Sequence, residues 1–274
     1  MTRTILITGV SSGLGKALAQ EALFQGWTVV GTVRQQDALQ AFECLLPGRA
    51  HGRLLDVRAT EQMPPLIAEI EERIGSIDVL VNNAGFGLIS TIEEAPLYQV
   101  REQFEINVFS CIAMLQAVLP YMRRRRAGRI LNITSMGGLL TFPSVGIYNA
   151  TKFAMEGVTE ALRQEVQEFG VKVTAIEPGL FKTDWAGRSQ QRGPESIRDY
   201  DELRKRRVSQ EINWNGNLEK GAKAMLAILD DPNPPGHLLL GTIADDLVRQ
   251  KLSTLTAEID KYRVLTRSTD IDAQ

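Results

Sequence analysis

The chain has 274 residues, of which 43% are apolar and 23% are charged, a balance typical of globular proteins with a sizeable core. Its 31 Lys and Arg residues nearly balance its 33 Asp and Glu residues, and the formal net charge of −2 excludes a globally basic nucleic-acid binder. The two cysteines, Cys44 and Cys111, show no CxxC spacing, which argues against a disulfide framework or a zinc module and favours a reducing compartment.

We expect neither a signal peptide at the N-terminus nor a partner-binding role for the basic run in the middle of the chain. The N-terminus lacks the long apolar stretch of a signal peptide, and no stretch approaches the ~18 apolar residues that cross a bilayer, so we expect a cytoplasmic protein without a membrane span. His51 and His237 have no partners at metal-ligand spacing, so we interpret both as structural and expect no metal site. Arg123–Arg126 falls at the predicted C-terminal end of a long helix, where cations interact favourably with the helix dipole. This position accounts for the basic run, so we expect no nucleic-acid partner.

Short apolar runs recur along the chain and alternate with stretches of helical spacing. The runs are nearly continuous in apolar character, as expected of parallel strands that are covered on both faces. They are Thr4–Thr8, Thr28–Val33, Gly52–Leu55, Ile77–Val81, Arg129–Thr134, Val171–Ile176 and His237–Leu240. This alternation predicts an α/β fold with a doubly wound (Rossmann) parallel sheet of about seven strands and helices on both faces. No repeat or linker divides the chain, so residues 1–274 are expected to form a single domain.

A polar region at residues 184–216 interrupts the alternation. It follows a predicted strand end and precedes a helix that starts near Leu218. Two interpretations remain open. The region is either a helical excursion on the surface or a substrate lid, because long insertions at strand carboxyl ends often bind substrates. Residues 242–274 are predicted to form a C-terminal helical tail, with one amphipathic helix over roughly Asp245–Tyr262.

A glycine-rich turn follows the first predicted strand and opens the first predicted helix. The turn spans Thr8–Gly15, with the spacing GxxxGxG rather than the commoner GxGxxG. Glycines let the backbone turn sharply and bring its N–H groups near a pyrophosphate, and the helix N-terminus adds partial positive charge. We therefore expect this turn to bind a dinucleotide through Gly9, Ser11, Ser12, Gly13, Leu14 and Gly15.

The end of the second predicted strand indicates which dinucleotide binds. NAD-binding folds commonly place a carboxylate there, which accepts hydrogen bonds from the ribose 2′-hydroxyl. This chain has Arg34 and no carboxylate at that place, and a guanidinium offers several donors to a 2′-phosphate. The glycine turn itself contains no basic residue, so the preference depends mainly on Arg34. The sequence therefore favours NADP(H) over NAD(H).

Tyr148 and Lys152 lie four residues apart in a predicted helix, which places a phenol and an ammonium on one face. A nearby cation favours the phenolate, so such a tyrosine could exchange a proton with an alcohol or a carbonyl. An isolated Y-x-x-x-K match is common by chance. Here, however, Ser135 ends a predicted strand at the sheet edge where open α/β sheets bind ligands. Asn82–Gly85 and Asp56-Val57 end two further strands in the same crevice.

Residues 3 to about 241 resemble the short-chain dehydrogenase/reductase family, in its single-domain branch. The resemblance is carried by ordered motifs at the family's spacing: Thr8–Gly15, Asn82–Gly85, Asn107 in the long fourth helix, Ser135, Tyr148–Lys152, and Pro178-Gly179 followed by Thr183. Within the family, the chain is somewhat more similar to steroid- and retinol-type members. The 184–216 region and the tail lie outside the shared pattern.

The resemblance implies a role for each matched residue. Tyr148 would be the general acid/base, Ser135 would hydrogen-bond the substrate oxygen, and Lys152 would bind the nicotinamide ribose and favour the phenolate. Asn107 would hold a water that links Lys152 to solvent. Family members that prefer NADPH often have a basic residue at the place of Arg34. Further cofactor contacts would come from Ser12 at that phosphate, Asp56 and Val57 at the adenine, Asn83, Ala84 and Gly85 at the adenosine ribose, and Pro178, Gly179 and Thr183 at the nicotinamide.

We therefore expect an oxidoreductase that transfers a hydride between NADP(H) and a small-molecule secondary alcohol or carbonyl substrate. Two alternatives remain open on the same fold: a nucleotide-binding regulator without turnover, and a non-redox epimerase or dehydratase. The regulator is less favoured because the chain has all four polar residues that the resemblance assigns to proton transfer. These are Asn107, Ser135, Tyr148 and Lys152. The resemblance also implies a homodimer or homotetramer formed through two long helices, here roughly Val100–Met122 and Tyr148–Phe169.

Overall fold

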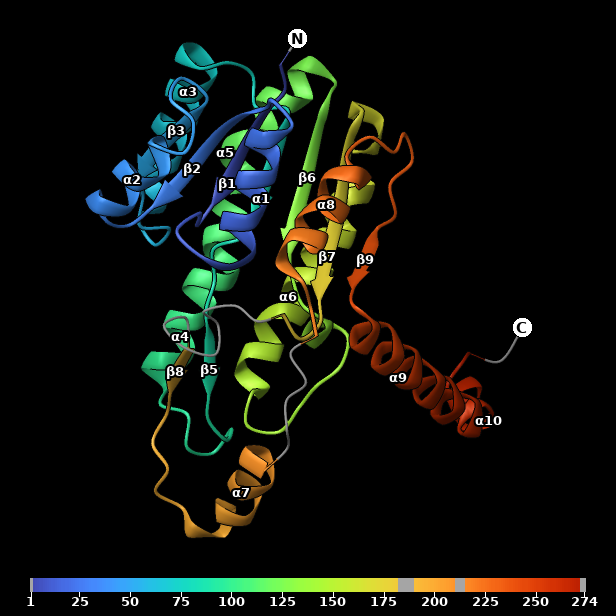
Figure 1. Ribbon diagram of the computed structural model, residues 1–274. Helices are drawn as coiled ribbons and strands as arrows, with labels where there is room; N and C mark the ends of the chain where they lie inside the picture. The colour runs from blue at the N-terminus through green and yellow to red at the C-terminus, as the bar shows by residue number, and fades with distance from the viewer. Residues whose placement is uncertain (1, 182–189, 210–214, 272–274) are drawn as a thin grey trace.

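The computed structural model describes residues 2–181, 190–209 and 215–271 and contains a seven-stranded sheet (Figure 1). Every neighbouring pair of its strands is parallel. In spatial order the strands are β3 (Ala50–Leu54), β2 (Thr28–Val33), β1 (Thr4–Thr8), β4 (Val79–Asn82), β6 (Gly128–Ile133), β7 (Val171–Pro178) and β9 (His237–Leu240). The order reverses between β1 and β4, where the carboxyl ends of the strands form a crevice. The predicted doubly wound α/β fold is confirmed.

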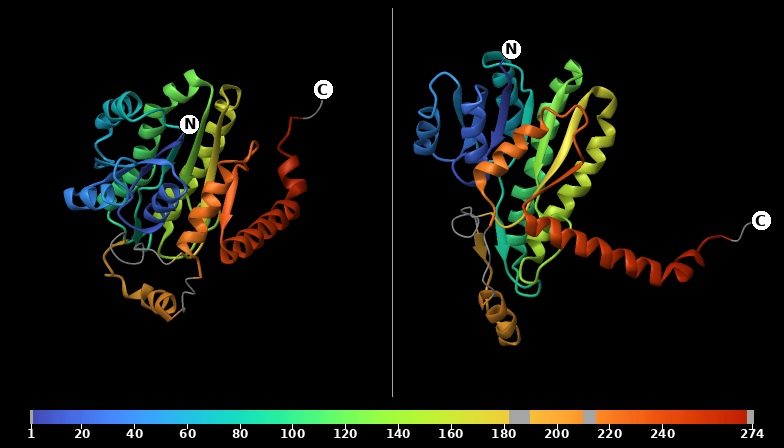
Figure 2. Two further views of the ribbon diagram at one scale, coloured as in Figure 1. Left: turned by 45° about the horizontal axis from the view of Figure 1, so that its top comes forward. Right: turned by 45° about the vertical axis from the view of Figure 1, so that its right-hand side comes forward.

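Helices cover both faces of the sheet (Figures 1 and 2). Alternate residues of a strand point to opposite faces, so Ile5 and Ile7 of β1 pack into one apolar cluster and Leu6 packs into another. The first cluster includes residues of α1 (Gly13–Phe24), α2 (Gln36–Glu43) and α8 (Leu218–Ile228). The second includes residues of α3 (Met63–Arg73), α5 (Ser110–Arg125) and α6 (Gly146–Glu165). Burial on both faces explains why the strand sequences are continuously apolar.

A small second sheet was not predicted from the sequence. It pairs β5 (Gly87–Ile89) with β8 (Gln190–Arg192) in parallel. Each of these strands has three residues, which is too short to give a periodic pattern. The strands of the main sheet, by contrast, differ from the predicted runs mainly at their ends; β4, for example, begins at Val79 rather than Ile77.

The long fourth helix is interrupted by a π-helical turn. It consists of α4 (Leu97–Phe104), the turn Glu105–Phe109 and α5. By length and composition alone, the stretch Leu97–Arg125 could cross a membrane. In this fold its inner face, including Met114 and Val118, is buried in the second apolar cluster, as in a core helix. The π turn contains Asn107, and such turns often lie at functional sites.

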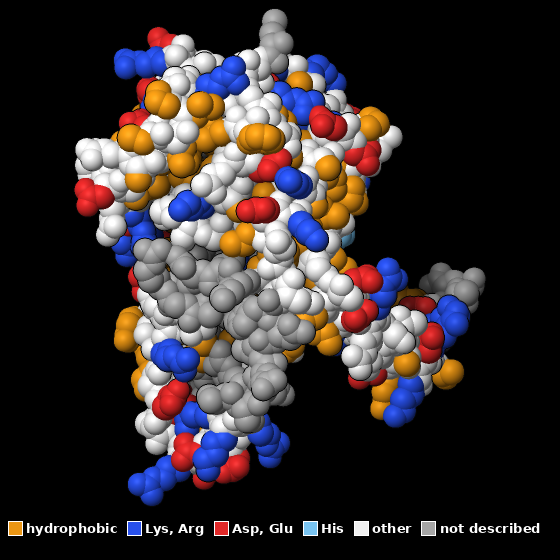
Figure 3. Space-filling view, in the orientation of Figure 1, with side chains coloured by type: hydrophobic (Ala, Val, Ile, Leu, Met, Phe, Trp, Pro, Cys, Tyr) orange, Lys and Arg blue, Asp and Glu red, His pale blue; other side chains and the backbone are white. Residues whose placement is uncertain are grey.

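The described part of the 184–216 region lies at the carboxyl ends of the main strands (Figure 1). It contains β8 and α7 (Asp201–Ser209), and a bridge between Phe181 and Gly216 brings its two ends together. Side chains of both charge signs are mixed over α7 (Figure 3). The segment is therefore a polar excursion with some helix and strand of its own.

Glu94, in the turn after β5, fastens this excursion to the body of the protein. Its buried carboxylate accepts hydrogen bonds from the backbone N–H groups of Ser196 and Ile197 at 2.7 and 2.8 Å. The Arg204 guanidinium lies 2.5 Å from the same carboxylate. A single buried acid therefore orients three residues of the excursion.

The chain beyond β9 forms α9 (Thr242–Lys261) and the short α10 (Arg263–Arg267). Both helices project from the body of the molecule (Figure 2). Ala244 and Val248, near the start of α9, are buried against Met136 and Leu140 from the loop after β6. The tail therefore begins in contact with the loop that connects β6 to α6.

Candidate active site

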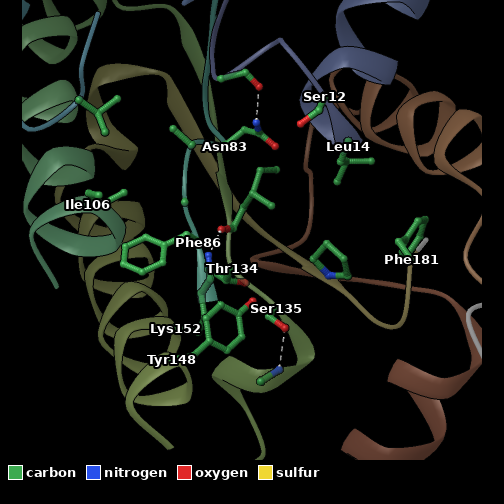
Figure 4. Close-up of a pocket in the computed structure, with 18 of the residues that line it drawn as sticks. Ser12, Leu14, Asn83, Phe86, Ile106, Thr134, Ser135, Tyr148, Lys152 and Phe181 are labelled. Carbon is green, nitrogen blue, oxygen red and sulfur yellow. Dashed lines mark hydrogen bonds between the residues drawn. The ribbon is translucent and has the colours of Figure 1, made fainter. Parts of the chain in front are cut away.

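The crevice contains a cavity of about 490 Å³. It extends from the glycine turn after β1 to the loop between β6 and α6 (Figure 4). Of the predicted site residues, Gly15 and Asn107 are not among its lining residues, and Thr183 lies outside the described residues. The cavity brings together all the others, namely Gly9, Ser11, Ser12, Gly13, Leu14, Arg34, Asp56, Val57, Asn83, Ala84, Gly85, Ser135, Tyr148, Lys152, Pro178 and Gly179.

The glycine turn depends on backbone geometry that side chains would disturb. Gly9 and Gly13 have φ values of 75° and 59°, in the left-handed region that favours glycine. A Cβ on Gly15 would lie 2.3 Å from both the Asn83 side chain and the Gly9 carbonyl oxygen. Gly15 therefore permits close packing within the turn instead of lining the cavity. The Asn83 amide donates to the carbonyls of Thr8 and Gly9, at 2.9 Å each, and holds the turn in place.

This turn fits the phosphate groups of a dinucleotide. Helix α1 begins after Ser12, whose side chain forms no capping hydrogen bond. The backbone N–H groups of the first helical turn therefore remain available to an anion, and the helix dipole favours negative charge there. Ser12, Gly13 and Leu14 all line the cavity at this point. The residues present thus match the predicted cofactor site.

Two arginines line the end of the cavity next to β2 and β3. Arg58, which the sequence analysis missed, binds Asp56 through Nε to Oδ1 at 3.0 Å and Nη2 to Oδ2 at 2.5 Å. The hydrogen-bonded Arg58 side chain lowers the pKa of Asp56, so this carboxylate stays charged and neutralises Arg58. Arg34 also lines the cavity, and no ion pair involving it is found among the described residues. The charge of Arg34 is therefore available to a ligand.

Ser135, Tyr148 and Lys152 converge at the other end of the cavity (Figure 4). Ser135 follows β6, and its Oγ accepts a hydrogen bond from the Gly137 N–H at 3.0 Å. A Cβ on Gly137 would lie 3.3 Å from the Ser135 Oγ and 3.6 Å from Cε1 of Tyr148, so the two side chains flank one small volume. The Lys152 ammonium lies 5.6 Å from the centre of the Tyr148 ring and donates to the Ile133 carbonyl at 2.9 Å.

This geometry is suited to proton transfer at Tyr148. The hydroxyls of Ser135 and Tyr148 can both reach an oxygen atom placed between them. The ammonium of Lys152, one helical turn along α6, lies 5.6 Å from the centre of the same ring. A carbonyl oxygen could therefore receive a proton here, and an alcohol could lose one.

Asn107 lies behind the cavity wall, in the π turn between α4 and α5. Its Oδ1 accepts from the Phe86 N–H at 3.0 Å, and its Nδ2 donates to the Phe86 carbonyl at 2.9 Å and to Thr151 Oγ1 at 3.1 Å. These bonds join the loop after β4 to α6. The side chain therefore braces the cavity wall at Gly85 and Phe86, and its expected role in holding a water stays a prediction.

Several apolar residues at this end of the cavity were not predicted as site residues. Except for Ile106, in the π turn, they follow the ends of β4, β6 and β7, close to the motifs that were predicted, and this position was the only signal available. Figure 4 shows Phe86 and Phe181 on opposite sides of the cavity. Gln191 of β8 also lines it, so the 184–216 region reaches the site. The apolar lining residues are Phe86, Ile106, Met136, Phe142, Val145, Leu180 and Phe181.

Comparison with known proteins identifies the family. The model of the short chain dehydrogenase family matches residues 3–193. The chain belongs to the short-chain dehydrogenase/reductase family. A crystal structure of a short-chain dehydrogenase from Streptomyces avermitilis superposes with a TM-score of 0.91 at 36% identity and covers 99% of each chain. The predicted resemblance is thus confirmed.

Two curated relatives are reductases. The enzyme is 36% identical to the 3-ketodihydrosphingosine reductase of Bacteroides thetaiotaomicron, over 94% of this chain and 95% of the relative. It is 34% identical to the NADPH-dependent 3-dehydrocapnine reductase of Ornithobacterium rhinotracheale, over 73% of this chain and 74% of the relative. The enzyme is therefore an NAD(P)-dependent oxidoreductase that acts on CH–OH or carbonyl groups.

Proposed function

We propose that the enzyme transfers a hydride between NADP(H) and a secondary alcohol or ketone that has an apolar chain. The observation that carries the proposal is the convergence of Ser135, Tyr148 and Lys152 at one end of a cavity whose other end is a helix N-terminus. When bound, the nicotinamide supplies or accepts the hydride, and the protein positions and polarises the reactants.

The protein's own residues control the proton. In the reducing direction Tyr148 gives its proton to the carbonyl oxygen, and in the oxidising direction the phenolate takes the proton of the alcohol. Ser135 hydrogen-bonds the same oxygen and keeps it beside the phenol. In the described part of the chain the Lys152 ammonium donates one hydrogen bond, to the Ile133 carbonyl, and its remaining donors can bind ribose hydroxyls. A water beside Asn107 returns protons from solvent to Lys152.

Cofactor preference follows from the charges at the β2–β3 end of the cavity. Arg34 offers donors to a 2′-phosphate, and Ser12 adds a hydroxyl at the same place. The carboxylate of Asp56 is neutralised by Arg58, so it does not repel that phosphate. The NADPH dependence of the Ornithobacterium relative supports the same choice. The remaining cofactor contacts are assigned to Val57, Asn83–Gly85 and Pro178-Gly179, and to Thr183 by resemblance alone.

The substrate class follows from the lining near Tyr148. Phe86, Phe142, Val145, Leu180 and Phe181 present apolar side chains around the reacting end, which favours a substrate with an apolar chain over a small polar one. Both curated relatives are named for reductions at a numbered position of a larger molecule, 3-ketodihydrosphingosine in one case. Gln191 adds a polar group, and we propose that the 184–216 region closes over the bound substrate.

Exposed aromatic side chains on two long helices support the proposed assembly. Phe109 and Phe153 are 53% and 43% exposed, and they lie on the two helical stretches expected to join subunits. Exposed phenylalanines on such helices favour burial between copies of the chain, as a homodimer or homotetramer. We propose that the whole chain acts as one catalytic unit and works in the cytoplasm.

The test is the consumption of NADPH by the purified enzyme with a panel of ketones, from short polar ketones to 3-ketodihydrosphingosine. We expect the highest kcat/KM for ketones with an apolar chain, and higher activity with NADPH than with NADH. NADPH binding without turnover on any alcohol or carbonyl would instead support the nucleotide-binding regulator. Product formation without net cofactor oxidation would support the epimerase or dehydratase.

A further inference from the structure

A second polar cluster lies one helical turn beyond Lys152. It consists of Glu156 from α6, Glu177 from β7 and His237, the first residue of β9. One side-chain ligand atom from each residue lies within 4.8 Å of the others. Glu156 and Glu177 are only 4% and 0% exposed, whereas the His237 side chain, on an edge strand, is 40% exposed. Two carboxylates are therefore inside the protein, with the imidazole between them and solvent.

The two buried carboxylates lack the partners that burial requires. Neither oxygen of Glu156 nor Oε2 of Glu177 has a hydrogen-bond partner within the described part of the chain. The hydroxyl of Thr134, which approaches Glu156, gives its proton to the Ile176 carbonyl at 2.9 Å. Unpaired buried acceptors are unfavourable, so a group that bound these oxygens would stabilise the cluster.

We propose that Glu156, Glu177 and His237 bind one divalent transition-metal ion, for which zinc is the best match. Imidazole nitrogen together with carboxylate oxygens suits zinc, whereas the nitrogen disfavours magnesium. The Nδ1 atom of His237 lies 3.4 Å from Glu156 Oε2 and 2.7 Å from Glu177 Oε1. Ligand atoms bound tetrahedrally to zinc stand roughly 3.3 Å apart, so the ion requires only a small widening of the contact with Glu177.

A third carboxylate supports the same assignment. The Nε2 atom of His237 lies 3.4 Å from Oε1 of Glu160, one turn further along α6. Metal-binding histidines commonly donate their second N–H to a carboxylate, which leaves the other nitrogen free to bind the ion. Nδ1 of His237 now forms a hydrogen bond with Oε1 of Glu177 at 2.7 Å, and Glu160 is close enough to accept from Nε2 when Nδ1 binds the ion instead.

The two nearest basic side chains, Lys152 and Arg163, do not form ion pairs with the buried glutamates in the described part of the chain. Lys152 donates to the Ile133 carbonyl, on the side of α6 toward the cavity. Arg163 lies against Gly236, where a Cβ would be 3.1 Å from its Nη1. Among the ion pairs of the described residues, neither cation is paired with Glu156 or Glu177. An incoming ion would therefore meet two carboxylates that have no cationic partner other than His237.

The site lies directly beneath the loop that carries Ser135. A Cβ on Gly138 would lie 2.9 Å from Oε1 of Glu156, so the turn after Ser135 rests on this carboxylate. An ion held between α6, β7 and β9 would fix that turn, and it would enter from solvent past His237. The inference rests on the geometry of this cluster and not on the proposed reaction.

The test uses the full chain, freed of metal with a chelator and titrated calorimetrically with Zn²⁺, with Mg²⁺ as the control ion. We expect one equivalent of zinc to bind and to raise the midpoint of thermal unfolding, with magnesium much weaker. His237→Gln should lower zinc affinity by more than about 100-fold, and Glu160→Gln by about 10–100-fold, the range for a supporting carboxylate. The matched control is His51→Gln, on the opposite edge strand β3.

Two results would overturn the proposal. Either no saturable zinc binding is seen, or binding is weakened equally by His237→Gln and His51→Gln. A proton shared by Glu156 and Glu177 would then account for the cluster. Because His237 is partly exposed, its substitution should leave the metal-free protein folded, which thermal unfolding without zinc verifies. None of these measurements requires turnover. The metal site can therefore be tested whether or not the proposed hydride-transfer reaction is correct.

Discussion

Two polar clusters, one with Lys152 and one with Glu156, lie one turn apart on α6. They differ in how many of their polar atoms form hydrogen bonds within the protein. In the first, Asn107 bonds to Phe86 and Thr151, and Lys152 bonds to the Ile133 carbonyl. In the second, three oxygens of Glu156 and Glu177 have no hydrogen-bond partner among the described residues. The first cluster is therefore in place without any ligand, whereas the second has acceptor oxygens that a group from outside the chain can bind.

The comparison distinguishes polar residues that stabilise the structure through their own hydrogen bonds from polar residues whose atoms can bind a ligand. A satisfied buried cluster positions its members, while an unsatisfied one carries a desolvation penalty that a bound group can remove. The arginines show the same contrast. Arg204 contacts Glu94 at 2.5 Å and Asp201 at 2.6 Å, whereas no ion pair of Arg34 is found in the described parts of the chain. Substitution of residues that are paired within the protein should affect stability. Substitution of residues without such partners should affect ligand binding.

The largest expected effect is the loss of turnover in Tyr148→Phe, beside the cluster of Asn107 and Lys152. Turnover should fall by about 10²–10⁴-fold, because the group that transfers the proton is removed. NADPH affinity should change little, since the aromatic ring stays in place. Steady-state NADPH consumption and a fluorescence titration with NADPH measure the two effects. Tyr121→Phe on α5, outside the cavity lining, is the matched control. A Tyr148→Phe enzyme with parental activity would refute the proton-transfer role.

The next effect concerns Arg34, the cation available to a ligand. Arg34→Asp should weaken NADPH binding by about 1.5–3 kcal/mol, the range for a hydrogen bond to a charged group, and change NADH binding much less. Arg58→Ala should be less selective, because Arg58 is already paired with Asp56. Calorimetric titration with both cofactors gives the comparison. Equal affinity of the parent enzyme for NADH and NADPH would contradict the assignment of Arg34.

Stability measurements test the comparison of the two clusters directly. Asn107→Ala should lower the free energy of unfolding by about 1–3 kcal/mol, because the Phe86 backbone groups and Thr151 lose a buried partner. Glu156→Gln should leave the stability of the metal-free protein unchanged or higher, since it removes a buried charge whose oxygens have no hydrogen-bond partner among the described residues. Urea unfolding of both variants without metal provides the values. Equal losses of stability in the two variants would remove the proposed distinction.

The smallest effect concerns the pH dependence of the excursion held by Glu94. The backbone N–H of Ile197, with further hydrogen bonds from Thr91, Arg204 and Ser196, lowers the pKa of Glu94 to about 2. A carboxyl whose pKa falls on folding stabilises the folded form at pH values above its ordinary pKa of about 4.3. This contribution is lost as the pH falls from there toward 2.

Hydrogen exchange at the amides of Ser196 and Ile197 measures this effect. Protection should fall in the parent between about pH 4 and pH 2, whereas Glu94→Gln should be less protected at neutral pH and show little further change. Glu93→Gln is the matched control, because within the described residues Glu93 accepts its hydrogen bond from the Tyr200 hydroxyl, at 2.7 Å, at the surface of the same segment. The same pH profile in the parent and Glu94→Gln would exclude Glu94 as the anchor.

Local patterns predicted most of the fold and much of the candidate site. The apolar runs predicted the seven strands, because burial on both faces of a parallel sheet requires continuous apolar sequence. Motif residues such as Arg34, Ser135 and Tyr148 meet in one cavity, because the carboxyl ends of parallel strands share an edge. Arg58 was missed, since one arginine among many has no distinctive spacing. The strands β5 and β8 were missed because three residues carry no period.

Sequence alone determined the alternation of strands and helices, the glycine turn and the serine, tyrosine and lysine of the site, since these depend on contacts within a few residues or on the shared edge of the sheet. Only the tertiary structure decided the surroundings of His237, which we had interpreted as an isolated structural residue. Parallel pairing sets Ala175 beside His237 and so brings Glu177 near, and α6 packs Glu156 onto both. Residues so distant in the chain show no common spacing, because their proximity depends on strand register and helix packing.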